Sequence, residues 1–366
     1  MKNVIITYGG FSCEHDISII TALGVYNANK NEDEYNYILV YMKNGVFYVG
    51  NKLTDMSSYI NFNEKGLREV VFKNRKMIES GKFFKKTTDI YCALVCNHGG
   101  SGENGSLSGF FELSGIPYTC STALGSSICM DKVFTKFLLQ KFKMPVVDYK
   151  VFRSVDNIDE LESLGYPVII KPANLGSSVG IAYADNKEEL IAGIKFALQF
   201  DQKLLIEKAL TNFEEYNCAV MDTPQGLLVS KIERPVFNKQ FLNFYDKYMA
   251  SEGIRREIDP PVDKKIKDRI LRLSQDIYTL FELKGIVRID YLYLDGRLYV
   301  NEINTIPGSL AYYLFKNEEL DFPSIIFATI ERAVEIFNQK SNLLTDFSST
   351  VLQSFCGNKL KKGVKK

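Results

Sequence analysis

The stretch from Leu283 to Leu314 most constrains what this chain can fold into. It reads LKGIVRIDYLYLDGRLYVNEINTIPGSLAYYL. β-Branched and aromatic residues dominate on both sides of Asp295 and Gly296, a pair that favours a tight hairpin turn. The stretch therefore predicts two antiparallel strands followed by a Pro-Gly turn.

Polar residues recur at fixed offsets in this hairpin. Side chains alternate along a strand, so Arg288 shares a face with Asp290, and Glu302 shares a face with Asn304. Hard oxygen ligands of this kind suit Mg²⁺, which commonly takes one or two carboxylates together with substrate phosphates. We therefore interpret Asp290, Glu302 and Asn304 as a candidate metal site rather than as surface charges of an edge hairpin.

The hairpin register sets a condition on this site. A two-residue turn at 295–296 would pair Asp290 with Asn301 and would point Glu302 to the other face. A shared metal instead needs Asp290 opposite Glu302. We predict a bulge or an odd-length loop near residues 295–297 that supplies the one-residue offset.

Length and composition describe an ordinary globular protein. The 366 residues can bury a large core and favour two or three domains. A net charge of +1 gives no indication of binding to nucleic acid or to a membrane surface. No segment approaches the roughly 20 apolar residues of a membrane span. The seven cysteines form no CxxC pair, so we expect reduced thiols and a cytoplasmic location.

The first part of the chain predicts an α/β domain with a ligand site. VIITYGG reads as a strand whose Gly-Gly turn leads into a helix from about Ser12, with Glu14 in its first turn. A second strand, DIYCALVCN, runs into a glycine-rich loop that carries His98, where open α/β sheets bind ligands. We favour a substrate-facing role for His98 over a purely structural one. Residues 62–88 read as charged and irregular.

Lysines and a Gly-Ser loop indicate a phosphate site further along. Residues 127–142 predict one amphipathic helix that carries Lys132. Lys171 ends a strand, and the loop at 176–180 follows it and can fold over phosphates. A polar, aromatic-rich loop around Lys247 is long enough to act as a lid. We place adenine and ribose near a junction between modules, beside Glu207, Lys208 and Glu215.

Taken in order, these motifs resemble those of D-alanine–D-alanine ligases in the ATP-grasp superfamily. The matching segments are GGFSCEHDIS, HGGSGENGSLSGFFELSGIPYTCS, MDK, IIKPANLGSSVG, EKAL with EEYNCAV, FYDKY, VRID and NEINTIPG. D-Alanyl-D-lactate and D-alanyl-D-serine ligases share this framework. The resemblance covers about residues 4–335.

The resemblance implies a three-domain α/β protein with an N-terminal doubly wound sheet. The expected domains are residues 1–120, 121–207 and 208–342, with 343–366 as a C-terminal extension. It implies a homodimeric enzyme that makes the cell-wall dipeptide from D-alanine with ATP and Mg²⁺, which Mn²⁺ can replace. No nucleic acid or membrane partner is expected.

The resemblance also implies roles for single residues. ATP phosphates would be bound by Lys132, Lys171, Ser178 and, from the lid, Lys247, while Glu207, Lys208 and Glu215 resemble adenine and ribose contacts. Glu14 resembles the residue that holds the ammonium of the first D-alanine, and with Ser177 and Tyr248 it matches a hydrogen-bonded triad. His98 lies near the first substrate. Arg288 and the Gly308 N–H resemble the oxyanion donors, and Asp290, Glu302 and Asn304 match the Mg²⁺ ligands.

One position departs from the family pattern. Tyr313 stands where the family commonly has a serine that binds the carboxylate of the second substrate. The acceptor could therefore be D-serine or another D-amino acid, or Ser309 could take over the role. Tyr248 argues against D-lactate, because lactate-selective relatives lack this tyrosine. A catalytically impaired nucleotide-binding regulator is the hypothesis from another class.

Overall fold

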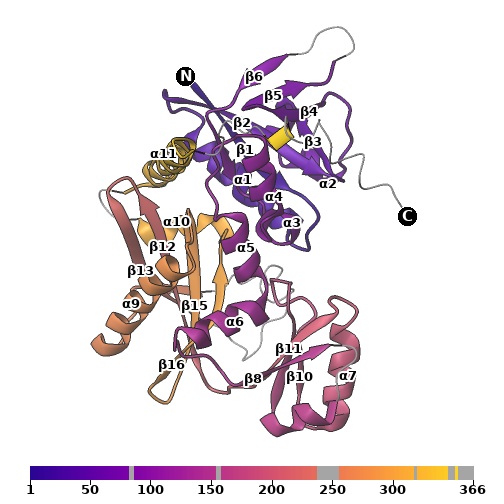
Figure 1. Ribbon diagram of the computed structural model, residues 1–366, viewed down its shortest axis with the longest axis vertical. Helices are drawn as coiled ribbons and strands as arrows, with labels where there is room; N and C mark the ends of the chain where they lie inside the picture. Colours follow the sequence, from indigo (N-terminus) through magenta and orange to yellow (C-terminus); the bar gives the residue numbers. More distant parts are fainter. Residues whose placement is uncertain (82–85, 154–157, 237–254, 317–319, 345–350, 353–366) are drawn as a thin grey trace.

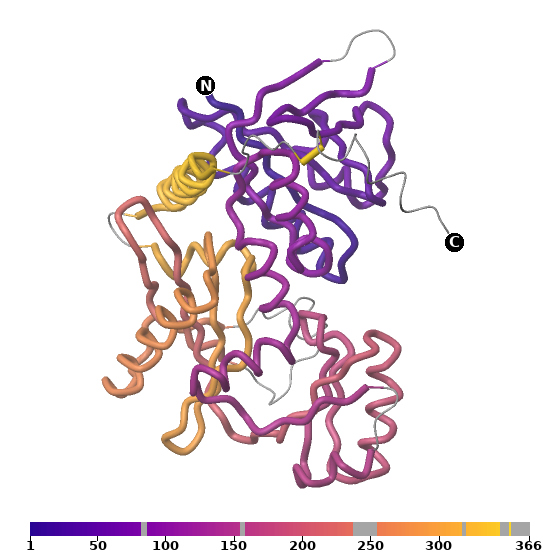
Figure 2. Tube along the Cα trace, viewed as in Figure 1, coloured from indigo at the N-terminus to yellow at the C-terminus, as the bar shows by residue number. Residues whose placement is uncertain are grey.

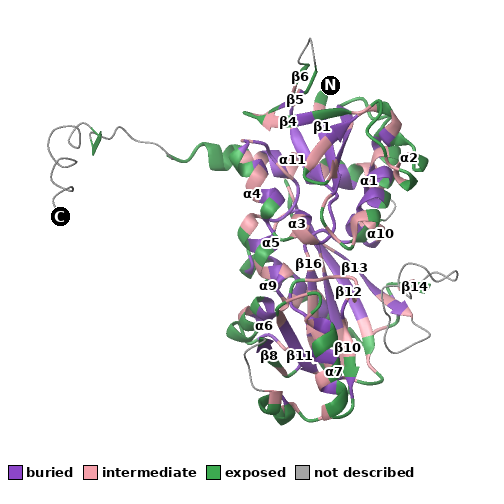
Figure 3. Cartoon of the chain, turned by 90° about the vertical axis from the view of Figure 1, so that its right-hand side faces the viewer, coloured by how far each residue is buried: buried purple, intermediate pink, exposed green. Residues whose placement is uncertain are grey.

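Three β-sheets follow one another along the chain (Figure 1). The structure is a computed structural model that describes residues 1–81, 86–153, 158–236, 255–316, 320–344 and 351–352. Strands form the buried layers, while the outer faces of the helices are exposed (Figure 3). Within the described residues, no helix is both long and apolar enough to cross a membrane.

The first sheet has the strand order β6-β5-β4-β3-β2-β1-β7. Three neighbouring strands are parallel: β2 (Tyr35–Lys43), β1 (Lys2–Gly9) and β7 (Cys92–Val95). The antiparallel strands are β3 (Val46–Val49), β4 (Arg68–Lys73), β5 (Lys76–Glu79) and β6 (Thr87–Asp89). The helices of this part are α1 (His15–Asn29), η1 (Asn51–Thr54), α2 (Ser57–Ile60), α3 (Gly100–Glu103) and α4 (Ser106–Leu113).

The segment at 62–88, which reads as irregular, contains regular structure and corrects that expectation. Strands β4 and β5 form a hairpin, and β6 pairs with β5. The turn between β4 and β5 places Asn74 and Arg75 at φ of 50° and 60°, which suits a tight antiparallel hairpin. The charged composition arises because these edge strands expose one face to solvent.

The second sheet has the order β10-β9-β11-β8 and is antiparallel. Its strands are β8 (Tyr149–Arg153), β9 (Val168–Pro172), β10 (Ala182–Ala184) and β11 (Lys203–Lys208). Helix α7 (Lys187–Ala197) packs Leu190 and Ile194 against this sheet, and η2 (Ile158–Leu164) joins the same core.

The third sheet is also antiparallel, in the order β14-β13-β12-β15-β16. Its strands are β12 (Glu214–Thr223), β13 (Gly226–Val236), β14 (Arg255–Ile258), β15 (Ile286–Leu294) and β16 (Arg297–Asn304). Helix α9 (Lys264–Leu280) buries Ile270 and Ile277, two turns apart, against one face. Further helices are η3 (Gly308–Ala311), α10 (Tyr312–Phe315) and α11 (Phe322–Ser341).

The helix expected over residues 127–142 is two helices, which corrects the single-helix prediction. Helix α5 (Ala123–Met130) ends before Asp131, and α6 (Lys132–Lys141) begins after it. Asp131 is extended, and its carboxylate accepts hydrogen bonds from the backbone N–H groups of Val133 and Phe134. An aspartate in this position caps a new helix. The break places Lys132 in the first turn of α6.

The hairpin of β15 and β16 confirms the predicted register offset but not its place. Asp295 and Gly296 have φ of 47° and 79°, as a two-residue hairpin turn requires. Asp290 pairs with Glu302, whereas Tyr291 pairs with Val300. The extra residue is therefore Asn301, within β16, and the prediction of an offset at the turn was wrong. A bulge there keeps the turn tight and still sets the carboxylates opposite each other.

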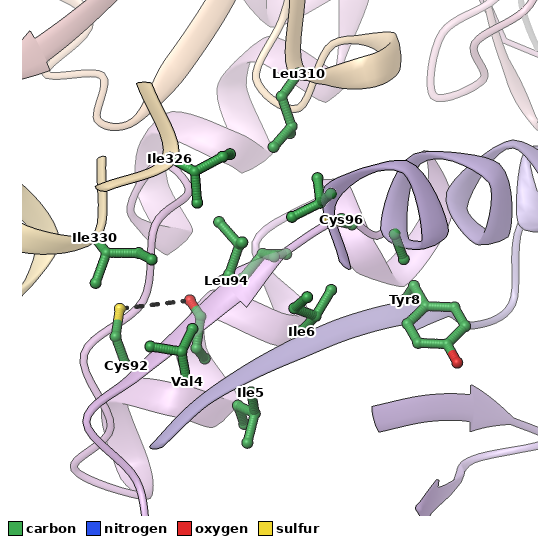
Figure 4. Close-up of a cluster of buried hydrophobic side chains, with 14 of the residues drawn as sticks. Val4, Ile5, Ile6, Tyr8, Cys92, Leu94, Cys96, Leu310, Ile326 and Ile330 are labelled. Carbon is green, nitrogen blue, oxygen red and sulfur yellow. Dashed lines mark hydrogen bonds between the residues drawn. The ribbon is translucent and has the colours of Figure 1, made fainter. Parts of the chain in front are cut away.

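Helix α11 returns to the first sheet (Figure 2). Ile326 and Ile330 of α11 and Leu310 of η3 lie beside Leu94 in the core of that sheet (Figure 4). Helix α11 also contacts β12. The first and third sheets therefore share one apolar core.

Candidate active site

A cavity between the second and third sheets gathers the residues expected to bind ATP. Its lining includes Lys132, Lys171, Ser178, Glu207, Lys208 and Glu215. Apolar walls come from Val147, Ile169, Leu205 and Leu292. Flat aromatic ligands with a charged end suit a cavity of this mixed character. Lys247, the expected lid lysine, lies outside the described residues.

A buried charge cluster forms one wall of this cavity, which we call the nucleotide cavity after its expected ligand. Lys136 Nζ lies 2.5 Å from Glu207 Oε1, and Lys171 is ion-paired with the other carboxylate oxygen. Burial raises the pKa of Glu207, but the two lysine charges outweigh it and hold the pKa at about 2. Burial lowers the pKa of Lys136, and Glu207 opposes this change. Glu207 therefore stays ionised at the edge of the cavity.

The bulge in β16 brings two consecutive residues to the same cavity. Asn301 and Glu302 both line it, although neighbours on a regular strand would face opposite ways. Lys171 Nζ donates a hydrogen bond to Asn301 Oδ1 at 3.3 Å, and Lys132 Nζ lies 3.2 Å from Glu302 Oε1. The lysines expected to bind phosphates thus contact the bulge directly.

A second cavity, of about 280 Å³, lies between the first and third sheets. Its lining includes Glu14, His98, Ser177, Arg288, Asp290, Glu302, Asn304, Gly308 and Ser309. Lys132, Gly176 and Glu302 line both cavities, so the two adjoin at these residues. We call this second cavity the substrate cavity.

Arg288 and Asp290 form a two-point ion pair in the substrate cavity. Nε of Arg288 lies 2.7 Å from Oδ1 of Asp290, and Nη2 lies 2.8 Å from Oδ2. The amide of Asn304 donates to Oδ2 of the same carboxylate at 3.0 Å. The guanidinium is thus oriented and keeps further N–H donors for a ligand.

The donor set at this place fits a hard divalent cation. Among the described residues, no group of three or more His, Cys, Asp or Glu could hold a metal alone. Asp290 and Glu302 are cross-strand neighbours on one face, and Asn304 lies beside them. Two carboxylates and an amide oxygen suit Mg²⁺, because substrate phosphates and water usually complete its shell.

Glu14 ties the first helix to the Gly-Ser loop. The hydroxyl of Ser177 donates to the Glu14 carboxylate, which stands at the N-cap of α1. A Cβ on Gly99 would lie 2.5 Å from that carboxylate and one on Gly176 would lie 2.8 Å from it, so a side chain at either position would displace the carboxylate. Ser177 and Ser178 have φ of 53° and 58°, a conformation that costs energy in non-glycine residues. Tyr248, the third member of the expected triad, lies outside the described residues.

His98 holds the loop that follows β16. Its Nδ1–H donates to the Ile306 carbonyl at 2.7 Å, so the neutral ring accepts at Nε2 from the Thr21 hydroxyl at 2.8 Å. Thr21 Oγ1 accepts in turn from the Ser309 N–H at 3.2 Å. Both ring nitrogens therefore bond the protein, and the chain of bonds fixes the backbone around Gly308.

Glu103 holds the same loop from another side, although its role was not predicted from the sequence. One carboxylate oxygen accepts from the Ile306 N–H at 2.9 Å and lies 3.3 Å from the Thr305 hydroxyl. The other accepts from the Gly99 N–H at 3.1 Å. Burial and the Glu14 charge raise the pKa of Glu103 to about 7, against the two N–H donors.

Replacing Glu103 with alanine should weaken both the fold and turnover. The substitution leaves the buried N–H groups of Gly99 and Ile306 unpaired, and each costs about 1–3 kcal/mol. We expect a loss of about 2–4 kcal/mol in unfolding free energy and at least a tenfold fall in turnover. Urea unfolding and phosphate release would measure these effects. Glu112→Ala, on the surface of α4, is the control and should change stability and turnover little. Equal losses in the two variants would contradict the role of Glu103 in holding the loop.

Stability should depend on pH through His98. Burial, assisted by the charge of Arg288, lowers its pKa from 6.5 to about 4 despite the bond to Ile306. The unfolded chain therefore binds the proton more readily than the folded chain. The contribution of neutral His98 to the unfolding free energy is fully present above pH 6.5 and is lost as the pH falls toward 4. Between these two pH values the unfolding free energy of wild type should fall by about 3 kcal/mol more than that of His98→Gln. Parallel pH curves of unfolding free energy would contradict the prediction. Glu103 has a raised pKa, so its effect on the pH dependence of stability has the opposite sign. This effect is present in both wild type and His98→Gln and does not enter their difference.

Tyr313 and Ser309 lie differently with respect to the substrate cavity. Ser309 lines it, whereas Tyr313 is not in its lining. The Tyr313 hydroxyl instead donates to Glu233 Oε2 at 3.2 Å. Ser309 has a φ of 51°, and its backbone N–H is used by Thr21. The residue that departs from the family pattern therefore stands behind the cavity wall, bonded to Glu233, and not in the wall itself.

Comparison with known proteins identifies the family. Residues 3–121 match the family description D-ala D-ala ligase N-terminus, and residues 138–331 match D-ala D-ala ligase C-terminus. The chain is 36% identical over 359 residues to the D-alanine–D-alanine ligase of Thermosipho melanesiensis. The matched segment covers 94% of this chain and 97% of the relative.

Solved structures show the same architecture. The D-alanine–D-alanine ligase of Coxiella burnetii has a TM-score of 0.80 at 22% identity and covers 94% of this chain and 97% of its own. The VanG D-Ala:D-Ser ligase of Enterococcus faecalis has a TM-score of 0.78 at 26% identity and covers 91% and 99%. Both halves of the sequence and the arrangement of its three sheets lead to one conclusion. The chain belongs to the D-alanine–D-alanine ligase family, whose members are ATP-dependent enzymes with the ATP-grasp fold.

Proposed function

We propose that the protein joins two D-alanine molecules into D-alanyl-D-alanine for peptidoglycan synthesis, at the expense of ATP. The main support is the junction of the two cavities at Lys132, Gly176 and Glu302. A γ-phosphate in the nucleotide cavity and a carboxylate in the substrate cavity would meet there. This arrangement suits activation of a carboxylate by phosphoryl transfer.

The chemistry would take two steps. A carboxylate oxygen of the first D-alanine attacks the γ-phosphorus of ATP. ADP is the leaving group, and an acyl phosphate is formed. The amine of the second D-alanine then attacks the acyl carbon and loses a proton, and phosphate departs. Positioning and charge neutralisation dominate the first step, and oxyanion donors lower the barrier of the second.

The described residues divide these tasks. Lys132 and Lys171 neutralise phosphate charge, and Glu14 holds the ammonium group of the first D-alanine. Arg288 and the Gly308 N–H face the oxyanion. Asp290, Glu302 and Asn304 would hold Mg²⁺ or Mn²⁺, which adds positive charge at the phosphates when bound.

D-Serine as the acceptor is the second candidate. It is favoured by Tyr313, which replaces the expected serine and bonds Glu233, and by the likeness to a D-Ala:D-Ser ligase. A nucleotide-binding regulator is less well supported, because Arg288 and Asp290 remain in place in the substrate cavity. We also propose that the enzyme works as a cytoplasmic homodimer, as its resemblance to the family implies; sedimentation of the purified protein would test the dimer.

The test is product identity. Purified protein would receive ATP, Mg²⁺ and D-alanine alone or paired with D-serine or D-lactate, and mass spectrometry would identify the products. We expect D-alanyl-D-alanine from D-alanine alone. Phosphate release only with a second amino acid would instead favour the alternative acceptor. No product from any mixture would contradict ligase activity.

A further inference from the structure

The substrate cavity must recognise a carboxylate besides the one that reacts. An amino-acid acceptor carries its carboxylate two bonds from the attacking amine, so this negative charge lies beside the reaction centre. A buried anion needs a charged or hydrogen-bonding partner. The cations that line the cavity among the described residues are Lys132, Arg256 and Arg288.

Two of these cations are already committed. Lys132 lies where the two cavities adjoin and pairs with Glu302 at 3.2 Å. Arg288 makes a two-point ion pair with Asp290, and the proposed function assigns its other donors to the reacting acyl group. Arg256, on β14, has a single ion pair among the described residues, at 3.5 Å between Nε and Glu233 Oε1. A guanidinium has five N–H donors, and the described residues leave most of those of Arg256 to a ligand.

Arg256 is held in place at the cavity wall. Its guanidinium carbon lies 4.7 Å from the centre of the Tyr313 ring, a distance typical of a cation–π contact. Glu233 is buried and is fixed by Asn217 Nδ2 at 3.1 Å and by the Tyr313 hydroxyl at 3.2 Å. The Arg256 side chain keeps 47% of its surface exposed. Tyr313 and Glu233 therefore orient an arginine that remains accessible.

We propose that Arg256 binds the carboxylate of the acceptor amino acid, with Tyr313 as the platform that positions it. The proposal rests on the ligase function above and names the group that selects the second substrate. Arginine suits this task, because its planar donors match the two oxygens of a carboxylate. The tyrosine at 313 contributes its ring face rather than its hydroxyl, which is used by Glu233.

Competition between two acceptors tests this assignment. Hydroxylamine attacks an acyl phosphate through nitrogen, releases phosphate and gives a hydroxamate, and it has no carboxylate. With ATP, Mg²⁺, D-alanine and fixed hydroxylamine in one mixture, each acyl phosphate becomes either dipeptide or hydroxamate. The ratio of the two products is independent of the amount of folded enzyme and of donor binding.

Arg256→Ala should lower the ratio of dipeptide to hydroxamate at least about tenfold, the usual effect of losing a charge-assisted contact. Arg256→Lys should recover part of the loss. Tyr313→Phe, which keeps the ring, should stay within about twofold of wild type, whereas Tyr313→Ala should follow Arg256→Ala. Arg255→Ala, the exposed neighbour on β14, is the matched control and should change nothing.

The outcomes separate the two proposals. If wild type forms both products and Arg256→Ala leaves their ratio unchanged, Arg256 does not bind the acceptor, although the ligase function stands. If Tyr313→Phe lowers the ratio as much as Arg256→Ala, the hydroxyl and not the ring carries the effect, and the platform role is wrong. If wild type forms neither product, the ligase function itself fails and the assignment of Arg256 fails with it.

Discussion

Arg288→Ala should lower dipeptide formation by about 10³-fold or more while ATP binding survives. Loss of one oxyanion donor commonly costs 10²- to 10³-fold in turnover. This substitution also leaves the carboxylate of Asp290 without its two-point partner, which adds to the loss. Arg288 lines the substrate cavity and is not in the lining of the nucleotide cavity, so nucleotide affinity should change little.

Phosphate release and calorimetric titration with an ATP analogue would measure the two effects separately. Arg297→Ala is the matched control, because Arg297 is exposed at the turn end of the same hairpin. Turnover of Arg288→Ala within tenfold of wild type would remove this arginine from the mechanism. A parallel loss of nucleotide affinity would mean that the variant disturbs the whole hairpin.

Glu207→Ala should destabilise the fold by about 3–5 kcal/mol, the usual cost of stranding a buried charge. Lys136 is 1% exposed, and Glu207 is its ion-pair partner at 2.5 Å. Without that carboxylate, folding must bury an unpaired ammonium or remove its proton. Lys171 also loses its ion pair, so the affinity for ATP should fall together with the unfolding free energy.

A paired substitution makes this experiment sharper. Lys136→Met combined with Glu207→Leu removes both buried charges, and it should recover most of the unfolding free energy that Glu207→Ala loses. Glu214→Ala removes a more exposed ion pair with Arg234 and should cost no more than about 1 kcal/mol. Equal urea midpoints for Glu207→Ala and Glu214→Ala would show that the buried pair does not support the fold.

Local patterns in the sequence predicted much of the fold because they reflect local physics. Strand alternation and the Asp-Gly turn gave the hairpin of β15 and β16, and register arithmetic required one extra residue in it. The arithmetic could not say where that residue goes, because a bulge at Asn301 and a longer turn give the same offset. The prediction of one helix over residues 127–142 overlooks Asp131, because an aspartate before an amphipathic run is a capping signal.

Contacts between distant segments account for what the sequence did not reveal. Glu103 stands in the glycine-rich loop after β7, but its partners Thr305 and Ile306 lie 202 and 203 residues away. Lys136 is buried against Glu207, 71 residues further along the chain, and no local pattern predicts this ion pair. Arg256 follows the segment expected to form the lid, and no local pattern links it to Tyr313.

The loop that carries Gly308 is fastened by Thr21, His98 and Glu103, which all come from the first hundred or so residues. Its neighbour Leu310 and helix α11 complete the apolar interior of that same region. Exchanging the amino-terminal third with that of a relative would therefore give a working chimera only if the borrowed segment makes the same bonds to residues 305–309. The loop and its distant supports must therefore come from the same protein.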